Sequence, residues 1–390
     1  MQQENQITKC FNQLRAACER ADFKGYDPFD GLNSKLFQAL PYIRSNRLCR
    51  LAWLQFFKRS PINFRPFLGV KKDYNPKGLG LFLSGYCNLY KAEQKEEYLE
   101  KINYLIGKIM ACQSSGYSGA CWGYHFDWQA KAFFQPKGTP SIVVSSYIAC
   151  ALLDAYEILH DEKLLKTARS TCDFILNDLF RTYDAQGHFA FSYSPVDETQ
   201  VFNASLLGGR LLCRVYAFTK EPVLIEESKK VVAFVCKRQQ ENGAWTYSPL
   251  PFHQWIDNFH TGYNLECIYT YQTVSGDDSF VNHFEKGLNY YLKTFFEKDG
   301  IPKYYSNSRY PVDVHNTAQL IITLSETGKF EENKGLIDKA LHWSQKNMFD
   351  EEKGHFYYIK QKYYAVKISY IRWIQAWMFL AYSHYILNTK

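Results

Sequence analysis

Residues 201–245, VFNASLLGGRLLCRVYAFTKEPVLIEESKKVVAFVCKRQQENGAW, contain the unit from which the fold can be predicted. The first part, 201–219, is small and apolar nearly all round, which is typical of a helix that is buried on every side. After a short break, residues 223–239 carry an apolar stripe on one side only, as a helix that faces water does. The polar residues that follow lead into Gly-Ala-Trp, which indicates a tight turn before a short aromatic segment.

Similar Gly-aromatic segments recur along the chain, each after a run of polar turn residues. They are GACWGYH from Gly119, GHFAFSY from Gly187, GAWTYSP from Gly243, GIPKYYS from Gly300 and GHFYYIK from Gly354, at spacings of 68, 56, 57 and 54 residues. Self-similarity with a period of this length indicates that one supersecondary unit is repeated.

Each pair of predicted helices between these segments consists of a buried helix followed by a half-exposed one. The pairs are 79–91 with 94–112, 141–159 with 162–179, 201–219 with 223–239, 258–274 with 279–296, and 312–326 with 332–347. The last buried helix, 367–387, has no partner after it, and a helix near 5–21 can take that place. Six such hairpins close into an all-α fold, an (α/α)6 toroid with short aromatic extended segments at one end. We expect residues 1–390 to form this single domain.

The toroid predicts where a ligand would bind. The aromatic segments join each outer helix to the next inner helix, so they gather at one end of the ring, and the N-termini of the inner helices point to that end. A mouth lined by aromatic rings, loop polar groups and helix N–H groups suits polar or anionic ligands. The 30 Tyr and 8 Trp supply ring faces with polar tips, which suit a sugar-binding cleft.

Four polar residues are predicted to lie at similar depth in this mouth. They follow the glycine of their aromatic segment by 16, 17, 15 and 18 residues, and are Asn203, His260, His315 and Arg372. A buried helix has no packing reason to begin with His or Arg in successive units. The pattern therefore indicates a polar site on the axis of the ring.

Two successive units carry an Asp–His–Asn cluster at the start of the buried helix. The members are Asp257, His260 and Asn264 in DNFHTGYN, and Asp313, His315 and Asn316 in VDVHNTAQ. A carboxylate beside an imidazole orients the ring for proton transfer. The alternative is that each Asp caps its helix and each His bonds a backbone carbonyl. The matching positions of the two clusters favour the catalytic interpretation.

The segment CWGYHFDWQAKAFFQPKGTPS, residues 121–141, is too rich in aromatic rings for a simple connection. Trp122 and Trp128 are candidates to stack on a sugar ring. His125 and Asp127 are candidates to contact its hydroxyl groups, and Asp127 is also a candidate acid. The alternative is that these rings plug the end of the toroid.

Two further segments bring candidates to the mouth. The loop GYDPFDGLNS, residues 25–34, is expected to reach over the mouth with Tyr26 and Asp30. The stretch SYIRWIQAW places Arg372 and Trp373 in the last buried helix. A buried Arg requires an anion, which is either a neighbouring carboxylate or the substrate.

Composition and charge argue against several classes of protein. The net charge is +7, but Lys and Arg are scattered, which disfavours nucleic acid binding. Eleven Cys without a CxxC pair, and an N-terminus without a signal pattern, predict a cytoplasmic protein. The apolar stretch 369–387 contains Arg372, Gln375 and His384, so it is expected to be a core helix and not a membrane span.

No zinc-site pattern and no phosphate loop occurs, so no metal or cofactor is expected. A homodimer is left open.

The repeat resembles the six-hairpin toroid superfamily, which includes glycosidases, unsaturated-glycuronyl hydrolases, N-acylglucosamine and cellobiose 2-epimerases, and glucuronyl C5-epimerase. Four segments more closely resemble VpsJ-type proteins of bacterial exopolysaccharide, capsule and O-antigen clusters: YSGACWGYHFDWQAKAFFQPKGTP, IDNFHTGYNLECI, VHNTAQ and RWIQAW. This resemblance spans nearly all of the chain and implies a role in surface polysaccharide synthesis or tailoring. The epimerase families use paired His on inner helices as acid and base; His260 and His315 fit this use, although the motifs around them differ.

We predict a sugar-active enzyme that moves a proton at a carbon next to a carbonyl or carboxylate, as an epimerase or lyase does. His260 is the predicted base, oriented by Asp257, and His315 is the opposing acid, while Arg372 holds a negative charge of the saccharide. The other candidates for substrate binding are Trp122, His125, Trp128, Asn203, Tyr263, Asn264, Asn316, Trp373, Tyr26 and Asp30. Two alternatives remain, which are a glycoside hydrolase with Asp127 and Asp257 as its carboxylate pair, and a non-catalytic glycan-binding protein.

Overall fold

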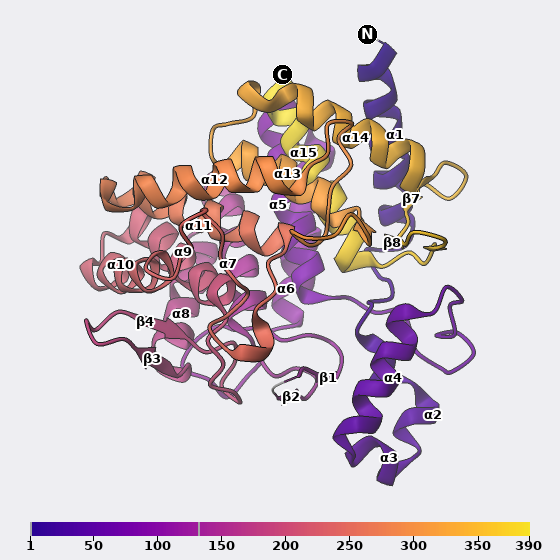
Figure 1. The fold of residues 1–390 in the computed structure, drawn as a ribbon, viewed down its shortest axis with the longest axis horizontal. Helices are drawn as coiled ribbons and strands as arrows, with labels where there is room; N and C mark the ends of the chain where they lie inside the picture. The colour runs from indigo at the N-terminus through magenta and orange to yellow at the C-terminus, as the bar shows by residue number, and fades with distance from the viewer. Residues whose placement is uncertain (1, 132) are drawn as a thin grey trace.

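The computed structural model describes residues 2–131 and 133–390, and it contains the predicted helix pairs in the predicted order (Figure 1). The pairs are α5 (Pro76–Glu93) with α6 (Glu96–Ala111), α7 (Ile142–Leu159) with α8 (Glu162–Asp178), α9 (Phe202–Thr219) with α10 (Pro222–Cys236), α11 (Asn258–Ser275) with α12 (Val281–Phe295), and α13 (His315–Glu326) with α14 (Lys334–Met348). The last inner helix begins with a π-helical turn, Ile371–Ala376, and continues as α15 (Trp377–Thr389). Helix α1 (Gln2–Arg20) packs against α15, as expected.

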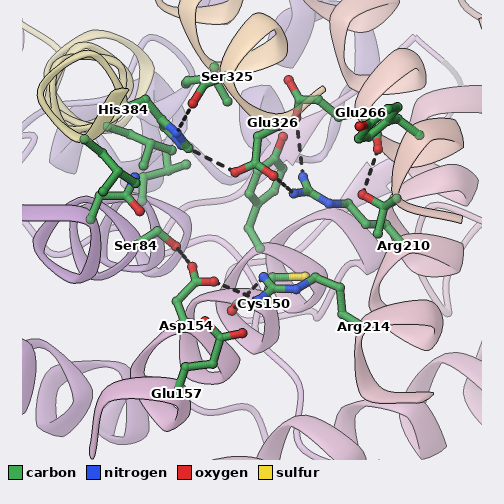
Figure 2. Close-up of a pocket in the computed structure, with 18 of the residues that line it drawn as sticks. Ser84, Cys150, Asp154, Glu157, Arg210, Arg214, Glu266, Ser325, Glu326 and His384 are labelled. Carbon is green, nitrogen blue, oxygen red and sulfur yellow. Dashed lines mark hydrogen bonds and ion pairs between the residues drawn. The ribbon is translucent and has the colours of Figure 1, made fainter. Parts of the chain in front are cut away.

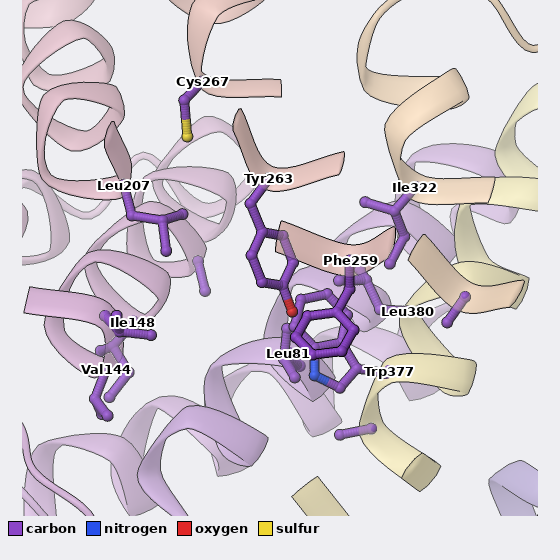
Figure 3. Close-up of a cluster of buried hydrophobic side chains, with 14 of the residues drawn as sticks. Leu81, Val144, Ile148, Leu207, Phe259, Tyr263, Cys267, Ile322, Trp377 and Leu380 are labelled. Carbon is purple, nitrogen blue, oxygen red and sulfur yellow. The ribbon is translucent and has the colours of Figure 1, made fainter. Parts of the chain in front are cut away.

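The inner helices close a ring. Each contacts the next in the order α5, α7, α9, α11, α13 and α15, and α15 returns to α5. Their apolar side chains converge on the axis, as Leu81, Ile148, Leu207, Ile322 and Leu380 show (Figure 3). A helix in this position has neighbours on all sides, which explains why its sequence is apolar nearly all round. The (α/α)6 toroid predicted from the sequence is confirmed.

Each of the first four inner helices ends in the same way. The residue after the helix is left-handed, with φ values of 51°, 53°, 57° and 72° at Gln94, His160, Lys220 and Gly276, and its N–H group bonds the carbonyl four residues earlier. This cap satisfies a terminal carbonyl and reverses the chain within a few residues. The outer helix can therefore pack directly on the inner helix that precedes it.

The repeated glycines have a geometric role. Gly187, Gly243, Gly300 and Gly354 all have positive φ angles, between 67° and 95°. A Cβ atom at Gly243 would lie 2.4 Å from the carbonyl oxygen of Lys286 in α12. Only glycine allows both this turn and this close approach to a neighbouring outer helix.

Short antiparallel strands flank these turns. β1 (Trp128–Gln129) pairs with β2 (Phe134–Gln135), β3 (Arg181–Tyr183) with β4 (Phe189–Phe191), and β6 (Phe349–Asp350) with β7 (His355–Phe356). A three-stranded sheet has the order β5 (Val312–Asp313), β8 (Ile359–Lys360) and β9 (Ala365–Val366). The turns at Gly187 and Gly354 thus lie within small hairpins, whereas the described segments after Gly243 and Gly300 contain no named strand.

Three short helices, which the sequence analysis did not predict, follow the loop 25–34. They are α2 (Lys35–Gln38), α3 (Pro41–Ser45) and α4 (Arg47–Arg59), and they project from the ring at the lower right of Figure 1. Leu32, Phe37 and Leu54 form a small core of their own beneath them. The C-terminal end of α4 faces the mouth of the ring.

One inner helix, α7, is long and apolar enough to cross a membrane by length and composition alone. Its mean hydropathy is 1.7, and 61% of it is buried inside the protein. This burial follows from the central position of α7, between α5 and α9. The late apolar stretch, as expected, is a buried helix of the ring.

Ring closure by α15 should dominate stability. Phe379 is fully buried, and its ring lies 5.4 Å from Phe11 of α1 and 5.3 Å from Phe82 of α5. We expect Phe379→Ala to lower the free energy of unfolding by about 3–5 kcal/mol, because it leaves a cavity where the ends of the chain meet. Urea denaturation measures this. Phe67→Ala is the matched control, since Phe67 is 83% exposed. An equal effect of both substitutions would contradict the prediction.

Candidate active site

A cavity of about 420 Å³ lies at the N-terminal ends of the inner helices; we call it the mouth cavity. Each inner helix contributes at least one residue from its first turn, and these include Lys77, Val143, Asn203, His260, His315 and Arg372. Four of these six are the residues that the spacing of the aromatic segments placed at similar depth. Val143 takes the corresponding place in α7.

The wall of the mouth cavity is aromatic. Four of the aromatic segments each contribute a tyrosine, namely Tyr124, Tyr193, Tyr247 and Tyr304. Phe126 and Trp128 line the wall beside Tyr124, and the rings of Tyr124 and Phe126 are stacked at 5.1 Å. Ring faces with nearby hydroxyl groups are suited to hold the apolar face of a sugar.

Asp257 and His260 form a dyad at the start of α11. Asp257 is the N-cap, since its carboxylate accepts a hydrogen bond from the backbone N–H of His260 at 3.1 Å. The same carboxylate lies 2.7 Å from Nδ1 of the His260 ring and accepts a bond from Trp255 Nε1 at 3.0 Å. Asp257 therefore caps the helix and also orients the imidazole ring, and no bond joins that ring to a backbone carbonyl of the described residues. With its proton on Nδ1, the ring has a free lone pair on Nε2, and the His260 side chain lines the cavity at 23% exposure.

His315 differs from His260, because it is almost fully buried. Its ring stacks between Phe259, at 4.8 Å, and Trp377, at 4.5 Å. Nε2 shares a hydrogen bond of 2.9 Å with the hydroxyl group of Tyr263, which also lines the cavity. Burial lowers the pKa of His315 well below its usual value, and the nearby cations Lys77 and Arg372 lower it further. These surroundings favour the neutral ring, and its hydrogen bond to Tyr263 links it to a second residue of the cavity lining.

The second cluster is thus not a copy of the first. Asp313 accepts a bond from the backbone N–H of His315 at 3.0 Å and one from Trp373 Nε1 at 2.8 Å, but it does not touch the imidazole ring. Trp373 stands edge-on to His315 at 5.2 Å and lines the cavity. Burial raises the pKa of Asp313 to about 7.

Arg372 has a carboxylate partner within the protein. Its Nε and Nη2 atoms donate to the two oxygens of Asp27 at 2.6 and 2.8 Å. The predicted anion for this buried Arg is thus Asp27, and its role as the main holder of substrate charge needs correction. Arg372 still lines the cavity, between the rings of Tyr124 and Trp373.

Three predicted residues of the 121–141 segment lie outside the mouth cavity. Trp122 is fully buried and donates from Nε1 to the carbonyl of Ile109, so it cannot stack on a sugar. His125 is buried and points away, because an extended segment alternates its side chains and Tyr124 and Phe126 take the cavity side. Asp127 lines a separate cavity and accepts a bond from the backbone N–H of Lys137 at 2.8 Å.

The loop 25–34 reaches the cavity with a residue other than those predicted. Phe29 lines the wall, whereas Tyr26 lines a different cavity beside α1. Asp30 is buried in an ion pair with Arg65 at 2.6 Å, so it supports the loop and does not face a ligand. The physical reason is that the buried guanidinium group requires a carboxylate partner.

Asn264 and Asn316 also lie outside the mouth cavity. Asn264 is on the face of α11 that carries His260, but it lies one turn deeper in the ring. Asn316 is fully buried, because it follows His315 directly and consecutive helical residues point about 100° apart. Asn203, in contrast, lines the cavity, and its Oδ1 has no hydrogen-bond partner among the described residues.

The sequence analysis missed several cavity residues. Lys77 is one, because no Gly-aromatic segment precedes α5 to place it in register. Lys58 and Arg59 are others, since they come from the unpredicted helix α4. The tyrosines of the wall could have been found, because each lies four to six residues after the glycine of its segment, as Tyr193 and Tyr247 do.

The opposite end of the ring holds a second cavity, of about 560 Å³, where the inner helices end (Figure 2). Arg210 lies between Glu266, at 3.4 Å, and Glu326, at 2.7 Å, while Arg214 pairs with Asp154 at 2.8 Å. Cations near helix C-termini are favourable, because those ends carry partial negative charge. Within the described part of the chain, no group of three His, Cys, Asp or Glu residues is placed to hold a metal ion.

Solved structures with the same architecture include enzymes of two kinds. Cellobiose 2-epimerase from Bacillus thermoamylovorans B4167 has 12% identity and a TM-score of 0.62, over 81% of this chain and 88% of that one. A D-mannose isomerase gives 12% and 0.61, over 81% and 87%. A family 76 glycoside hydrolase from a bovine Bacteroides thetaiotaomicron strain gives 14% and 0.62, over 82% and 70%. No protein-family model and no curated protein sequence matches the chain. At these identities the similarity establishes the (α/α)6 toroid fold alone.

The two histidines should be in opposite tautomers. Nδ1–H of His260 donates a hydrogen bond to Asp257, whereas Nδ1 of His315 has no partner among the described residues, which favours a proton on Nε2. Two-bond ¹H–¹⁵N NMR spectra at pH 8 would distinguish the tautomers, with His260→Gln and His315→Gln for assignment. In Asp257→Ala, only the His260 signals should change tautomer. A common tautomer for both rings would contradict this arrangement.

Proposed function

We propose that the chain is a carbohydrate-active enzyme in which His260 moves a proton at a sugar carbon next to a carbonyl or carboxylate, as an epimerase or lyase does. The observation that carries the proposal is the Asp257–His260 dyad, which opens into a cavity walled by aromatic rings. The structural neighbours named as a sugar epimerase and a sugar isomerase support this class of substrate.

The dyad is suited to act as a base. Asp257 fixes the imidazole of His260 with its protonated nitrogen inward, so that Nε2 can take a proton from a bound sugar. The carboxylate also stabilises the imidazolium that forms. Proton return to the same carbon gives inversion, and loss of a neighbouring leaving group gives elimination.

The opposing acid in this proposal is the Tyr263–His315 pair, and not His315 alone. When Nε2 of His315 donates to the Tyr263 oxygen, the Tyr263 O–H group is free to donate into the cavity. Burial raises the pKa of Tyr263 well above its usual value, so the hydroxyl group keeps its proton. It can therefore donate its proton to a developing carbanion or alkoxide, while the Nε2–H group of His315 stabilises the tyrosinate oxygen until solvent returns a proton to it.

We also propose a wider setting for this activity. The resemblance to VpsJ-type proteins supports a role in bacterial surface polysaccharide synthesis or tailoring. All eleven cysteines are free thiols, which supports a reducing, cytoplasmic location. The main hydrophobic core runs from Ile7 to Tyr385 and supports one toroid domain as the functional unit.

The hydrolase alternative loses its predicted carboxylate pair. Asp127 and Asp257 line different cavities, so they cannot act on the same glycosidic bond. Asp257 is the one carboxylate residue among the described residues that line the mouth cavity. Proton transfer by histidine accounts for the geometry better than a pair of carboxylates.

Substitution of the base should abolish exchange. We expect the full chain, incubated in D2O with a panel of hexoses, N-acetylhexosamines and hexuronates, to incorporate deuterium at one carbon of a sugar, measured by NMR. His260→Ala should slow this exchange by roughly 10²–10⁴-fold. The control is His188→Ala, because His188 forms a similar pair with Asp184 at 3.1 Å on the β3–β4 hairpin, outside the cavity. Saccharide binding without exchange would instead support a glycan-binding protein.

The Tyr263 hydroxyl group should matter separately. Tyr263→Phe keeps the ring, which stacks on Trp377 at 5.5 Å, and removes only the oxygen bonded to His315. We expect deuterium exchange to slow by roughly 10–100-fold with little change in sugar binding, since the removed group acts on the transition state. Equal exchange rates in the variant and the unchanged protein would show that Tyr263 is not the acid.

A further inference from the structure

Lys77 occupies the floor of the mouth cavity. It is the second residue of α5, after Asn75, which caps the helix by accepting a bond from Gly78 N–H at 3.3 Å. The Lys77 side chain is only 5% exposed. Its ammonium nitrogen lies 4.2 Å from the ring centre of Tyr147 and 5.1 Å from that of Trp377.

This ammonium group has no carboxylate of its own. Among the residues that the structure describes, Lys77 Nζ makes no hydrogen bond or ion pair. The charges that act on Lys77 are those of Arg372 and Asp27, and Arg372 already binds both oxygens of Asp27. Burial lowers the pKa of Lys77 well below its usual value, and Arg372 adds to this.

Lysine at this position carries a free-energy cost, because its ammonium group is removed from water. Methionine or leucine would fill a space between aromatic rings without the cost of removing a charge from water. Cation–π contacts with Tyr147, Trp377 and Tyr263 recover only a part of that cost. An anion brought by a ligand would supply the missing partner.

The charge of the whole cavity agrees with this reasoning. Its described lining contains five cationic side chains and one carboxylate: Lys58, Arg59, Lys77, Lys131, Arg372 and Asp257. Asp257 is held by His260, and helix N-termini around the mouth add partial positive charge. The cavity is therefore electropositive. Lys58, Arg59 and Lys131 also lack an ion pair within the described residues, but they are partly or fully exposed, whereas Lys77 is buried.

We propose that Lys77 selects an acidic sugar, by pairing its ammonium group with the carboxylate of a uronate-type substrate at the floor of the mouth cavity. This inference rests on the proposed function, because it names the substrate class of the same site. A carboxylate carries one charge and matches one ammonium group. When His260 takes the proton from the carbon next to the carboxylate, the electron pair moves onto that carboxylate, and Lys77 would stabilise the added charge.

The test compares sugars that differ only at one carbon. The probes are D-glucuronate, D-galacturonate and D-mannuronate, each matched with its hexose and its hexose 6-phosphate, and dissociation constants are measured on the full chain by calorimetry. We expect one uronate to bind at least about 10-fold more tightly than its hexose, as a charge-assisted hydrogen bond predicts. Lys77→Met should weaken uronate binding by roughly 10–100-fold and leave the hexose within about 3-fold.

Lys91→Met is the matched control. Lys91 lies on the same helix at the opposite end of the ring, where it pairs with Glu157 at 2.6 Å. It should leave the preference for the uronate unchanged. Lys77→Gln keeps a polar side chain without the charge, and it provides a second variant if Lys77→Met unfolds.

Three outcomes would overturn the inference. They are no uronate preference in the unchanged protein, a preference that survives both Lys77 variants, and a stronger preference for the 6-phosphate. The proposed function is judged separately, since His260→Ala should lose deuterium exchange and keep the uronate preference. If deuterium exchange occurs but no uronate is preferred, only the role of Lys77 is rejected. If Lys77 determines a uronate preference but no sugar undergoes exchange, only the proton-transfer function is rejected.

Discussion

The convergence of six helix N-termini on one axis is the constraint on which the rest of this structure depends. Inner helices that touch neighbours on every side must be apolar along most of their length. Their first turns, where N–H groups lack intrahelical partners, can hold polar side chains at low cost. The ring therefore brings Lys77, Asn203, His260, His315 and Arg372 together, although they are spread over nearly 300 residues of sequence. A site of this kind is a consequence of closing the toroid, and its chemistry depends on which residue each unit places there.

Two buried ion pairs adapt this general plan to a particular cavity. Arg372 binds Asp27 through two hydrogen bonds, and Arg65 binds Asp30 at 2.6 Å. The first pair fixes the loop 25–34 to the last inner helix. The second fixes the loop to Arg65, which also donates to the Tyr370 hydroxyl group just before that helix, and Phe29 lies at one side of the mouth. Arg372 and Asp30 were predicted to bind substrate, because they are charged and close to the mouth. Instead they form ion pairs with Asp27 and Arg65 inside the protein. The buried cation without an ion pair is then Lys77, which no Gly-aromatic segment precedes in the sequence.

The sequence predicted the fold well, because the period of the aromatic segments and the alternation of buried and amphipathic helices are properties of single residues and their spacing. It predicted side-chain directions less well. In WGYHFDW the polar residues His125 and Asp127 drew attention, but the alternation of an extended chain turns Tyr124, Phe126 and Trp128 toward the cavity. Helix α4 and the buried Lys77 could not be predicted, because neither belongs to the repeated Gly-aromatic pattern. The burial of individual side chains was hardest to predict. Nothing in VDVHNTAQ shows that Phe259 and Trp377 cover the ring of His315.

The difference between the two Asp–His clusters bears most directly on the proposed mechanism. Both aspartates bond the backbone N–H of their histidine, but only Asp257 reaches the imidazole ring. His260 therefore has an adjacent negative charge that stabilises the imidazolium formed when it takes a proton. His315 has aromatic faces and nearby cations instead, which keep it neutral and make it a donor through Tyr263. In the proposed mechanism these two similar sequence patterns become a base and an acid, because the surroundings of His260 favour positive charge and those of His315 oppose it. This asymmetry suits a reaction in which one group removes a proton and another returns one.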